Sequence, residues 1–544
     1  MNHGAMNHGA MNHGAMIARL GAAAGALALA VLGTAGSAGA AALSPGPAGS
    51  GSWTVYHGDP AGTGVAGPVT AVDTRARAWT SPALDGEIYG EPLAFSGRVY
   101  VATENDTVYA LSSATGRVAW SARLGPPVPS SSLPCGDISP TVGITGTPVI
   151  DPARDEIFVV ADKLVHGTPA HVLAGLSAGS GRVEMTEDVD PPGADPAALL
   201  QRTGLTLDDG RVVFGLGGNF GDCASYRGRV IAVPETGGRA MTFTVDARPG
   251  ESQGAVWMGG AAPVVDARGH VWVAVGNGSV YSSAHAYDDS DSVLGLSPAM
   301  RLLQYFAPGT WPANNAADLD MSTAPVLLPD GQVILAGKSR IVYLLNGARL
   351  GGIGHEQAAL GSACGQDIDG GIALSGMTVY LPCASGVIAV RATRSPPALR
   401  LLWTAGVAGG PPIIAAGLVW TVGQDGTLYG LDPATGAVRQ RAPVGAEANH
   451  FPTPSVGDGL MLVPAAQDVV AFAARGSGAA PPASPAATPA GTPATAAAPP
   501  ARGQTGPPGG GLPAGAVAGI AAGGLAVIAG GGWLLWRRRL TGHN

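Results

Sequence analysis

Residues whose types and spacing could support chemistry are few, and they lie in short polar stretches between apolar segments. Asp318 and Asp320 are separated by one residue, and Asn277 stands between two glycines. Lys338 follows a glycine, and Asp222 ends a glycine-rich stretch. Carboxylate and amide oxygens are ligands that calcium takes, and a carboxylate can serve as a general base. These residue types therefore permit metal or acid–base chemistry.

Each of these residues also has a plain interpretation as part of a turn. Asn277 tolerates a positive φ between its glycines. Asp318 and Asp320 can cap a turn before a strand expected at 326–328, and Lys338 can be a solvated hairpin residue. The residues alone leave both interpretations open.

The four cysteines exclude several kinds of site. None forms a C-x-x-C pair, so a zinc ribbon, a thioredoxin-type site and c-type haem attachment have no support. After export, Cys135 with Cys223 and Cys364 with Cys383 are candidate disulfides, the second closing a hairpin region. Four cysteines permit three connectivities, so the other two pairings remain open.

Composition narrows the fold and the partners. The 544 residues include 85 Gly and 45 Pro, and only 12% are charged, which disfavours helical bundles and coiled coils. The net charge is -8, so no basic field is available for nucleic acid.

The N-terminus predicts export. Arg19 precedes an apolar run at residues 20–32, and Ala38-Gly39-Ala40 is typical of a cleavage site, so residues 1–42 are expected to be a signal peptide. The sequence Met-Asn-His-Gly-Ala occurs three times before Met16, which favours tandem duplication upstream of a start at Met16 over a histidine metal site.

The C-terminus predicts an anchor. Residues 476–513 are rich in Ala, Pro, Gly, Ser and Thr and predict an extended linker. Residues 514–536 carry no charge and are long enough to span a bilayer, and three arginines follow at 537–539. We expect a single-pass protein at the cell surface with a cytoplasmic tail at 537–544 and an extracytoplasmic domain at 43–475.

The segment between these ends contains a repeat. A turn, often with glycine, is followed by a β-branched residue and often an aromatic one, and this recurs eight times at intervals of 40 to 62 residues. The marker positions are Tyr100, Phe158, Phe214, Trp272, Ile334, Tyr380, Trp420 and Leu462.

The surroundings of the markers recur as well. A segment ending in Pro often precedes a marker, and a second strand, a Thr-Gly turn and a last strand with Trp often follow it, as at Thr115-Gly116 and Trp120. Four short strands per unit and eight units predict an all-β fold, an eight-bladed β-propeller. Two β-sandwiches in tandem are the competing interpretation.

The chain ends predict how the ring closes. The last unit ends near Ala474 after its third strand, whereas Trp79 near the start has no preceding partners and resembles the last-strand Trp403. We expect the strand at Trp79 to pair with residues 469–472 and complete the eighth blade.

The repeat resembles the PQQ-type (quinoprotein alcohol dehydrogenase-like) propellers over roughly residues 53–474. The resemblance is carried by the opening Trp53-x-x-Tyr56-His57-x-Asp59 and by Asp425-Gly426-Thr427-Leu428-Tyr429 with the turn at Thr435-Gly436. It looks closest to the polyvinyl-alcohol dehydrogenase-like branch, through the stretches at 143–151, 276–278 and 287–293.

The resemblance implies a cofactor site in the central channel, with PQQ and calcium. It implies that Asn277 contacts the cofactor and the calcium, that Asp318 is the catalytic base near the metal, and that Lys338 contacts the quinone. Asp320 is then a near neighbour of the base. A family glutamate that binds calcium is replaced by the stretch ending in Asp222, which can act as a ligand only with a shifted backbone.

Two function classes remain open. A binding or interaction module is favoured by three departures from the family. The calcium-binding glutamate is missing, the disulfide between adjacent cysteines that covers PQQ in many family members is missing, and so is the haem motif. The retained Asn277, Asp318 and Lys338 favour a PQQ- and calcium-dependent alcohol dehydrogenase. The sequence names no substrate, protein partner or small-molecule ligand.

Overall fold

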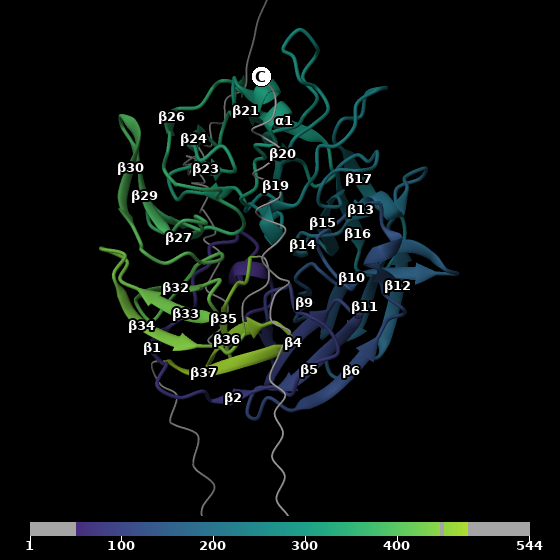
Figure 1. Ribbon diagram of the computed structural model, residues 1–544, viewed down its shortest axis with the longest axis vertical. Helices are drawn as coiled ribbons and strands as arrows, with labels where there is room; N and C mark the ends of the chain where they lie inside the picture. Colours follow the sequence, from purple (N-terminus) through teal and green to yellow (C-terminus); the bar gives the residue numbers. More distant parts are fainter. Residues whose placement is uncertain (1–50, 447–450, 477–544) are drawn as a thin grey trace, which may run out of the picture. The chain divides into compact units, whose positions relative to one another are not determined.

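The computed structural model describes residues 51–446 and 451–476, and these form eight small antiparallel sheets arranged as the blades of a β-propeller (Figure 1). The predicted signal peptide, most of the linker, the predicted span and the tail lie outside the described residues. Among the described residues no helix is long and apolar enough to cross a membrane. The last described strand ends at Gly476, one residue beyond the predicted end of the domain.

Blades 1 to 4 come from the first half of the described chain. Each is a sheet in which neighbouring strands follow one another in sequence. Blade 1 contains β3 (Leu93–Phe95), β4 (Arg98–Thr103), β5 (Thr107–Ser112) and β6 (Val118–Arg123); blade 2 contains β9 (Val149–Asp151), β10 (Glu156–Val165), β11 (Thr168–Ser177) and β12 (Val183–Asp188); blade 3 contains β14 (Thr206–Asp208), β15 (Arg211–Gly218), β16 (Arg229–Pro234) and β17 (Met241–Thr244); blade 4 contains β18 (Val264–Val265), β19 (Val271–Val275), β20 (Ser292–Leu296) and β21 (Leu302–Ala307).

Blades 5 to 8 complete the ring. Blade 5 contains β22 (Val326–Leu327), β23 (Gln332–Ala336), β24 (Val342–Asn346) and β26 (Ala358–Leu360); blade 6 contains β27 (Ala373–Ser375), β28 (Thr378–Leu381), β29 (Ile388–Arg394) and β30 (Pro397–Thr404); blade 7 contains β31 (Ile413–Ala415), β32 (Leu418–Val422), β33 (Thr427–Leu431) and β34 (Val438–Pro443); blade 8 contains β35 (Ser455–Gly457), β36 (Leu460–Ala465), β37 (Asp468–Gly476), β1 (Val69–Asp73) and β2 (Trp79–Thr80).

The remaining elements lie outside this four-strand pattern. β13 (Leu199–Leu200) pairs with β15, β25 (Gly352–Ile353) adds a parallel strand to β21, and β7 (Val128–Pro129) pairs with β8 (Thr141–Val142). The described residues also contain one helix, α1 (Trp311–Ala317). They contain four 3-10 turns, which are η1 (Tyr56–Gly58), η2 (Ser130–Ser132), η3 (Pro196–Ala198) and η4 (Met258–Gly260).

All eight sequence markers fall in the second strand of a blade, from Tyr100 in β4 to Leu462 in β36, so the predicted count of eight is confirmed. The predicted closure is also confirmed. Trp79 in β2 pairs with Ala471 in β37. β1 pairs with β37 as well, with Val72 opposite Ala474, which the sequence analysis did not anticipate. The two distant parts of the chain thus complete one sheet.

The recurring Trp and the recurring Thr-Gly turn form one contact between neighbouring blades. Trp79 of blade 8 donates from Nε1 to Ser113 O of blade 1 at 2.7 Å. A Cβ at Gly116, which has φ +69°, would lie 2.5 Å from the ring of Trp79, so this position requires glycine. The same arrangement joins blade 6 to blade 7 through Trp403 with Gly436, and blade 1 to blade 2 through Trp120 with Gly181, where the turn is Ser-Gly.

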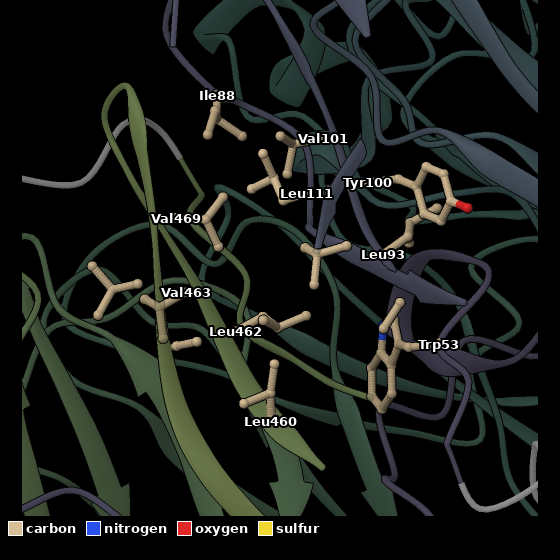
Figure 2. Packing of buried hydrophobic residues seen from close by; sticks show 14 of the residues in the cluster. Trp53, Ile88, Leu93, Tyr100, Val101, Leu111, Leu460, Leu462, Val463 and Val469 are labelled. Carbon is tan, nitrogen blue, oxygen red and sulfur yellow. The ribbon is translucent and has the colours of Figure 1, made fainter. Parts of the chain in front are cut away.

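The core lies between blades because each sheet buries both faces. Figure 2 shows Val101 and Leu111 of blade 1 close to Leu462 and Val469 of blade 8, whereas the ring of Tyr100 points the other way, and its hydroxyl donates to Ala178 O of blade 2. All five side chains are at most 1% exposed. Burial on both faces explains why the strands are apolar rather than alternating and why so few residues are charged.

Residues 51–66 cross the inner strands near the centre of the ring, where η1 is drawn in purple in Figure 1. Trp53 exchanges backbone hydrogen bonds with Ala94 of β3. Further carbonyls of this segment accept from blades 2, 4, 6, 7 and 8; the pairs are Thr54 with Ile150, Pro60 with Val265, Thr63 with Leu374, Gly64 with Ile414 and Gly51 with Asp458. The opening motif is therefore structural, since it ties six blades together at the axis.

Candidate functional site

The residues that the sequence singled out lie at corresponding places in adjacent blades. Asn277 follows β19 of blade 4, Lys338 follows β23 of blade 5, and Asp222 follows β15 of blade 3. Because every blade has the same strand order, its second strand ends on the same face of the ring. Regular repetition alone thus places three residues separated by about sixty positions each on one face.

Asp320 is the hub of the group. Its Oδ1 accepts from the backbone N of Asn277 at 2.6 Å, and its Oδ2 forms an ion pair with Lys338 Nζ. Its backbone O accepts from the backbone N of Lys338 at 2.9 Å. The Asp320 side chain is fully buried. A Cβ at Gly337 would lie 2.1 Å from this backbone oxygen, so the glycine before Lys338 permits the close approach.

Asp318, the predicted base, lies at the edge of this group. It caps the C-terminus of α1 in a left-handed conformation with φ 55°, and its side chain is 62% exposed. Both carboxylate oxygens are 3.3 Å from Lys338 Nζ. Partial burial and the charge of Asp320 raise the pKa of Asp318 to about 6, against the opposing effect of Lys338. The carboxylate is thus accessible, and its pKa lies above the ordinary value of an aspartate.

Lys338 remains charged in this setting. Burial by itself lowers the pKa of its ammonium, but the nearby charges of Asp320 and Asp318 outweigh burial and raise the pKa above its ordinary value. Its side chain is 24% exposed. The lysine therefore neutralises the buried Asp320 and also reaches the exposed Asp318.

Asp222 and Asn277 form the neighbouring part of the group. Asp222 Oδ1 accepts from the Tyr226 hydroxyl at 2.7 Å. Burial raises the pKa of Asp222, while Tyr226 and the Asn277 side chain lower it. Asn277 is 6% exposed, and its Oδ1 has no hydrogen-bond partner among the described residues. An amide oxygen is thus left as an unused acceptor beside two carboxylates.

Sequence reasoning missed two aspartates that lie near Lys338. Burial raises the pKa of Asp369 to about 6, and Lys338 and Ser322 oppose that shift. Burial raises the pKa of Asp367, with opposing effects from Lys338 and Arg340. Both follow a cysteine in the stretch Cys364-Gly-Gln-Asp-Ile-Asp. The D-x-D spacing, identical to that of Asp318 and Asp320, is the signal that could have found them.

Arg202 is a third residue that the sequence analysis missed. Its guanidinium lies 5.7 Å from the ring centres of both Tyr89 and Phe451. Burial lowers its pKa, and Glu104 opposes that shift. A Cβ at Gly260 would lie 2.4 Å from the guanidinium. An arginine in the apolar stretch before Gly204 was the available sequence signal.

The two predicted disulfide pairs are bonded in the structure. Cys135 is joined to Cys223 with a Cα–Cα distance of 6.0 Å, and Cys364 to Cys383 with 5.8 Å. The first fixes the loop that carries Asp222. The second fixes the loop that precedes Asp367 and Asp369.

The residues do not form a ready calcium site. Within residues 51–446 and 451–476 no group of three His, Cys, Asp or Glu side chains is arranged to hold a metal ion. Both oxygens of Asp320 are engaged, one by Asn277 and one by Lys338. Calcium takes six to eight oxygen ligands, so it would have to displace the ammonium of Lys338 from the central carboxylate. The donor set thus does not fit calcium as it stands.

The group described above, which we call the polar face, consists of Asp222, Asn277, Asp318, Asp320 and Lys338. The eight-bladed fold that carries it is that of a PQQ-type propeller. The model of the family described as outer membrane protein assembly factor BamB matches residues 65–291 and 395–480, more than half of the chain. The chain belongs to this PQQ-repeat family. No curated protein matches the chain significantly in sequence.

Solved structures share the fold at low identity. Quinohemoprotein alcohol dehydrogenase from Comamonas testosteroni aligns with a TM-score of 0.59 and 15% identity, over 79% of this chain and 82% of that one. A europium-containing methanol dehydrogenase aligns with a TM-score of 0.55 and 14% identity, over 76% and 89%. BamB from Moraxella catarrhalis aligns with a TM-score of 0.50 and 13% identity, over 74% and 100%. These likenesses support the fold and do not single out the polyvinyl-alcohol dehydrogenase-like branch.

Proposed function

We propose that the protein is a binding or interaction module, a PQQ-repeat propeller held outside the membrane by a C-terminal anchor. The observation that carries this proposal is the state of Asp320. Its charge is neutralised by Lys338 and its second oxygen accepts from Asn277, so the centre of the polar face is complete without a metal. Because the charge of Asp320 is already neutralised, this face can bind a partner or ligand without a metal. The dehydrogenase chemistry of the family would instead need calcium beside these residues.

Export and anchoring rest on separate observations. Two disulfides are bonded, and disulfides persist mainly in oxidising compartments. Two sequence features support export and anchoring. An apolar run follows Arg19, as in a signal peptide, and the uncharged residues 514–536 precede three arginines, as in a membrane span. Protease treatment of intact cells tests the placement. We expect cleavage in the linker at 476–513 to release the propeller, and a propeller that stays protected until the cells are lysed would contradict it.

Catalysis is tested with the purified full-length protein, PQQ and calcium. We expect no saturable uptake of the quinone, followed by absorbance, and no reduction of an electron-accepting dye with alcohols. Uptake of PQQ with alcohol-dependent dye reduction would overturn the proposal. Asp318→Asn then decides whether the activity uses the predicted base, because it keeps the size of the side chain and removes its proton-accepting charge.

A PQQ- and calcium-dependent alcohol dehydrogenase is the second candidate. It is favoured by the unpartnered Oδ1 of Asn277 and by the accessible carboxylate of Asp318, whose pKa of about 6 suits a general base. This candidate requires Lys338 to leave Asp320 when calcium arrives. In the reconstituted protein, alcohol-dependent activity that falls on Asp318→Asn would support it.

A further inference from the structure

The turn that carries Lys338 also forms one wall of a separate cavity. Ser339, Arg340 and Ile341 line an open cavity of about 580 Å³ between blades 5 and 6, whereas Lys338 contacts the carboxylates described above. The volume lies within the range of small-molecule sites, roughly 300 to 1,000 Å³. Neighbouring residues of one turn thus contribute to two separate sites, the group around Asp320 and this cavity.

The walls of the cavity are held in position. Arg340 has φ 61°, a left-handed conformation that few residues other than Gly, Asn and Asp adopt, and its carbonyl accepts from Ala363 N at 3.1 Å. The second wall is the loop 361–365, which the disulfide between Cys364 and Cys383 fastens to the end of β28. The third wall is β30, through Leu401 and Thr404.

The lining combines one cation with hydroxyl and apolar groups. Arg340 is exposed, and its side-chain hydrogen bond from Nη1 to Gly365 O is long, at 3.5 Å. Within the described residues it forms no ion pair, although its charge opposes the raised pKa of Asp367. Among the described residues the guanidinium thus has no partner stronger than this long hydrogen bond, and Arg340 is part of the lining of the cavity. Leu401, 38% exposed, and Ile341 supply apolar surface beside it.

We propose that this cavity binds a small organic carboxylate with a short apolar stem. A guanidinium presents parallel N–H donors that match a carboxylate, and hydroxyls at Ser362 and Thr404 can donate further hydrogen bonds. The apolar side of the lining would bury the stem and disfavours inorganic phosphate, which has none. The site is distinct from the group around Asp320. The ligand's carboxylate would pair with Arg340, whereas Lys338 is already paired with Asp318 and Asp320.

The test is calorimetric titration of the purified full-length protein at low salt and pH 7.5 with acetate, butyrate, hexanoate, n-hexylamine and inorganic phosphate. We expect binding to strengthen about two- to fourfold with each added methylene from acetate to hexanoate. We expect n-hexylamine not to bind. Hexanoate affinity that does not exceed that of acetate or phosphate would overturn the proposal.

Arg340→Asn separates a specific site from general adsorption, since Asn tolerates the left-handed backbone. We expect it to weaken hexanoate binding at least tenfold, as for the loss of a charged hydrogen bond. Arg349→Asn is the matched control because Arg349 is exposed in the same blade, outside the cavity, and it should bind as the unaltered protein does. Equal binding by both variants would contradict the assignment.

A second variant covers the case in which Arg340→Asn does not fold. Leu401→Glu places a negative charge on the exposed wall and should abolish hexanoate binding while leaving the backbone of β30 intact. Binding unchanged by Leu401→Glu would overturn the proposal. Neither outcome bears on quinone uptake at the channel, so the two proposals fail separately.

Discussion

Replacing Lys338 by methionine would expose how the buried Asp320 is stabilised. The change removes the ammonium and keeps an unbranched side chain of similar length. Asp320 is fully buried and would keep only its hydrogen bond from Asn277. Breaking a buried ion pair costs about 3 to 5 kcal/mol. The lower end applies because Lys338 is 24% exposed, and about 3 kcal/mol corresponds to a fall in Tm of roughly 3 to 4 °C for a domain of this size.

The sign of the pH dependence follows from the same reasoning. Without Lys338 the buried Asp320 carboxylate has no counter-charge, and burial disfavours its ionised form. The penalty is therefore greatest at high pH, where the carboxylate carries its charge, and shrinks at low pH, where protonation removes that charge. Thermal unfolding at pH 5 and pH 8, at one scan rate, measures both.

Two controls separate the ion pair from loss of packing. Lys338→Met with Asp320→Asn removes the charge that needs compensation and should recover most of the lost Tm. Arg349→Met alters an exposed cation in the same blade and should change Tm little. A Lys338→Met variant whose Tm falls equally at both pH values, with no recovery in the double variant, would refute the reasoning.

Three further outcomes are expected. Asp369 has a folded pKa of about 6, above its ordinary value, so its contribution to stability is present at low pH and is lost as the pH rises toward 6. Asp369→Asn should therefore flatten the fall in Tm between pH 4 and 6, and an unchanged slope would contradict this. Gly436→Ala should lower the free energy of unfolding by at least 1 to 3 kcal/mol, since its Cβ would lie 2.5 Å from the ring of Trp403 at φ +72°; a denaturant titration with no shift would count against the contact between blades. Replacing Cys364 and Cys383 by serine opens a loop of 19 residues and should cost about 3 kcal/mol; chemical denaturation of the double variant measures the loss, and stability equal to that of the oxidised protein would show that the bond constrains little.

The repeat was accessible to sequence analysis because it is local. Each blade is formed by neighbours in sequence, so the marker, the turn and the strand recur in one short segment. The pairing of Trp79 with β37 was accessible as well. The N-terminal segment has a last strand without its blade, the C-terminal blade lacks a last strand, and in a closed ring the two complete each other.

The candidate site was accessible only in part. Asn277, Lys338 and Asp222 could be chosen because the resemblance to PQQ-type propellers pointed to them, and the structure places each after the second strand of its blade. Asp318 and Asp320 could not be ranked from the sequence. Their roles differ because α1 leaves Asp318 exposed, while Gly337 and the backbone of Asn277 enclose Asp320. The sequence analysis expected no helix at this place.

By itself the sequence determined the eight-fold repetition and the seam, since these depend on patterns within short windows; the signal peptide and the membrane anchor stay predictions. Only the tertiary structure decided which carboxylate is neutralised, that Asp367 and Asp369 lie near Lys338, and that Arg340 lines a separate cavity. Those features depend on distances across blades. Such distances are set by the packing of sheets against each other, which no short stretch of sequence encodes.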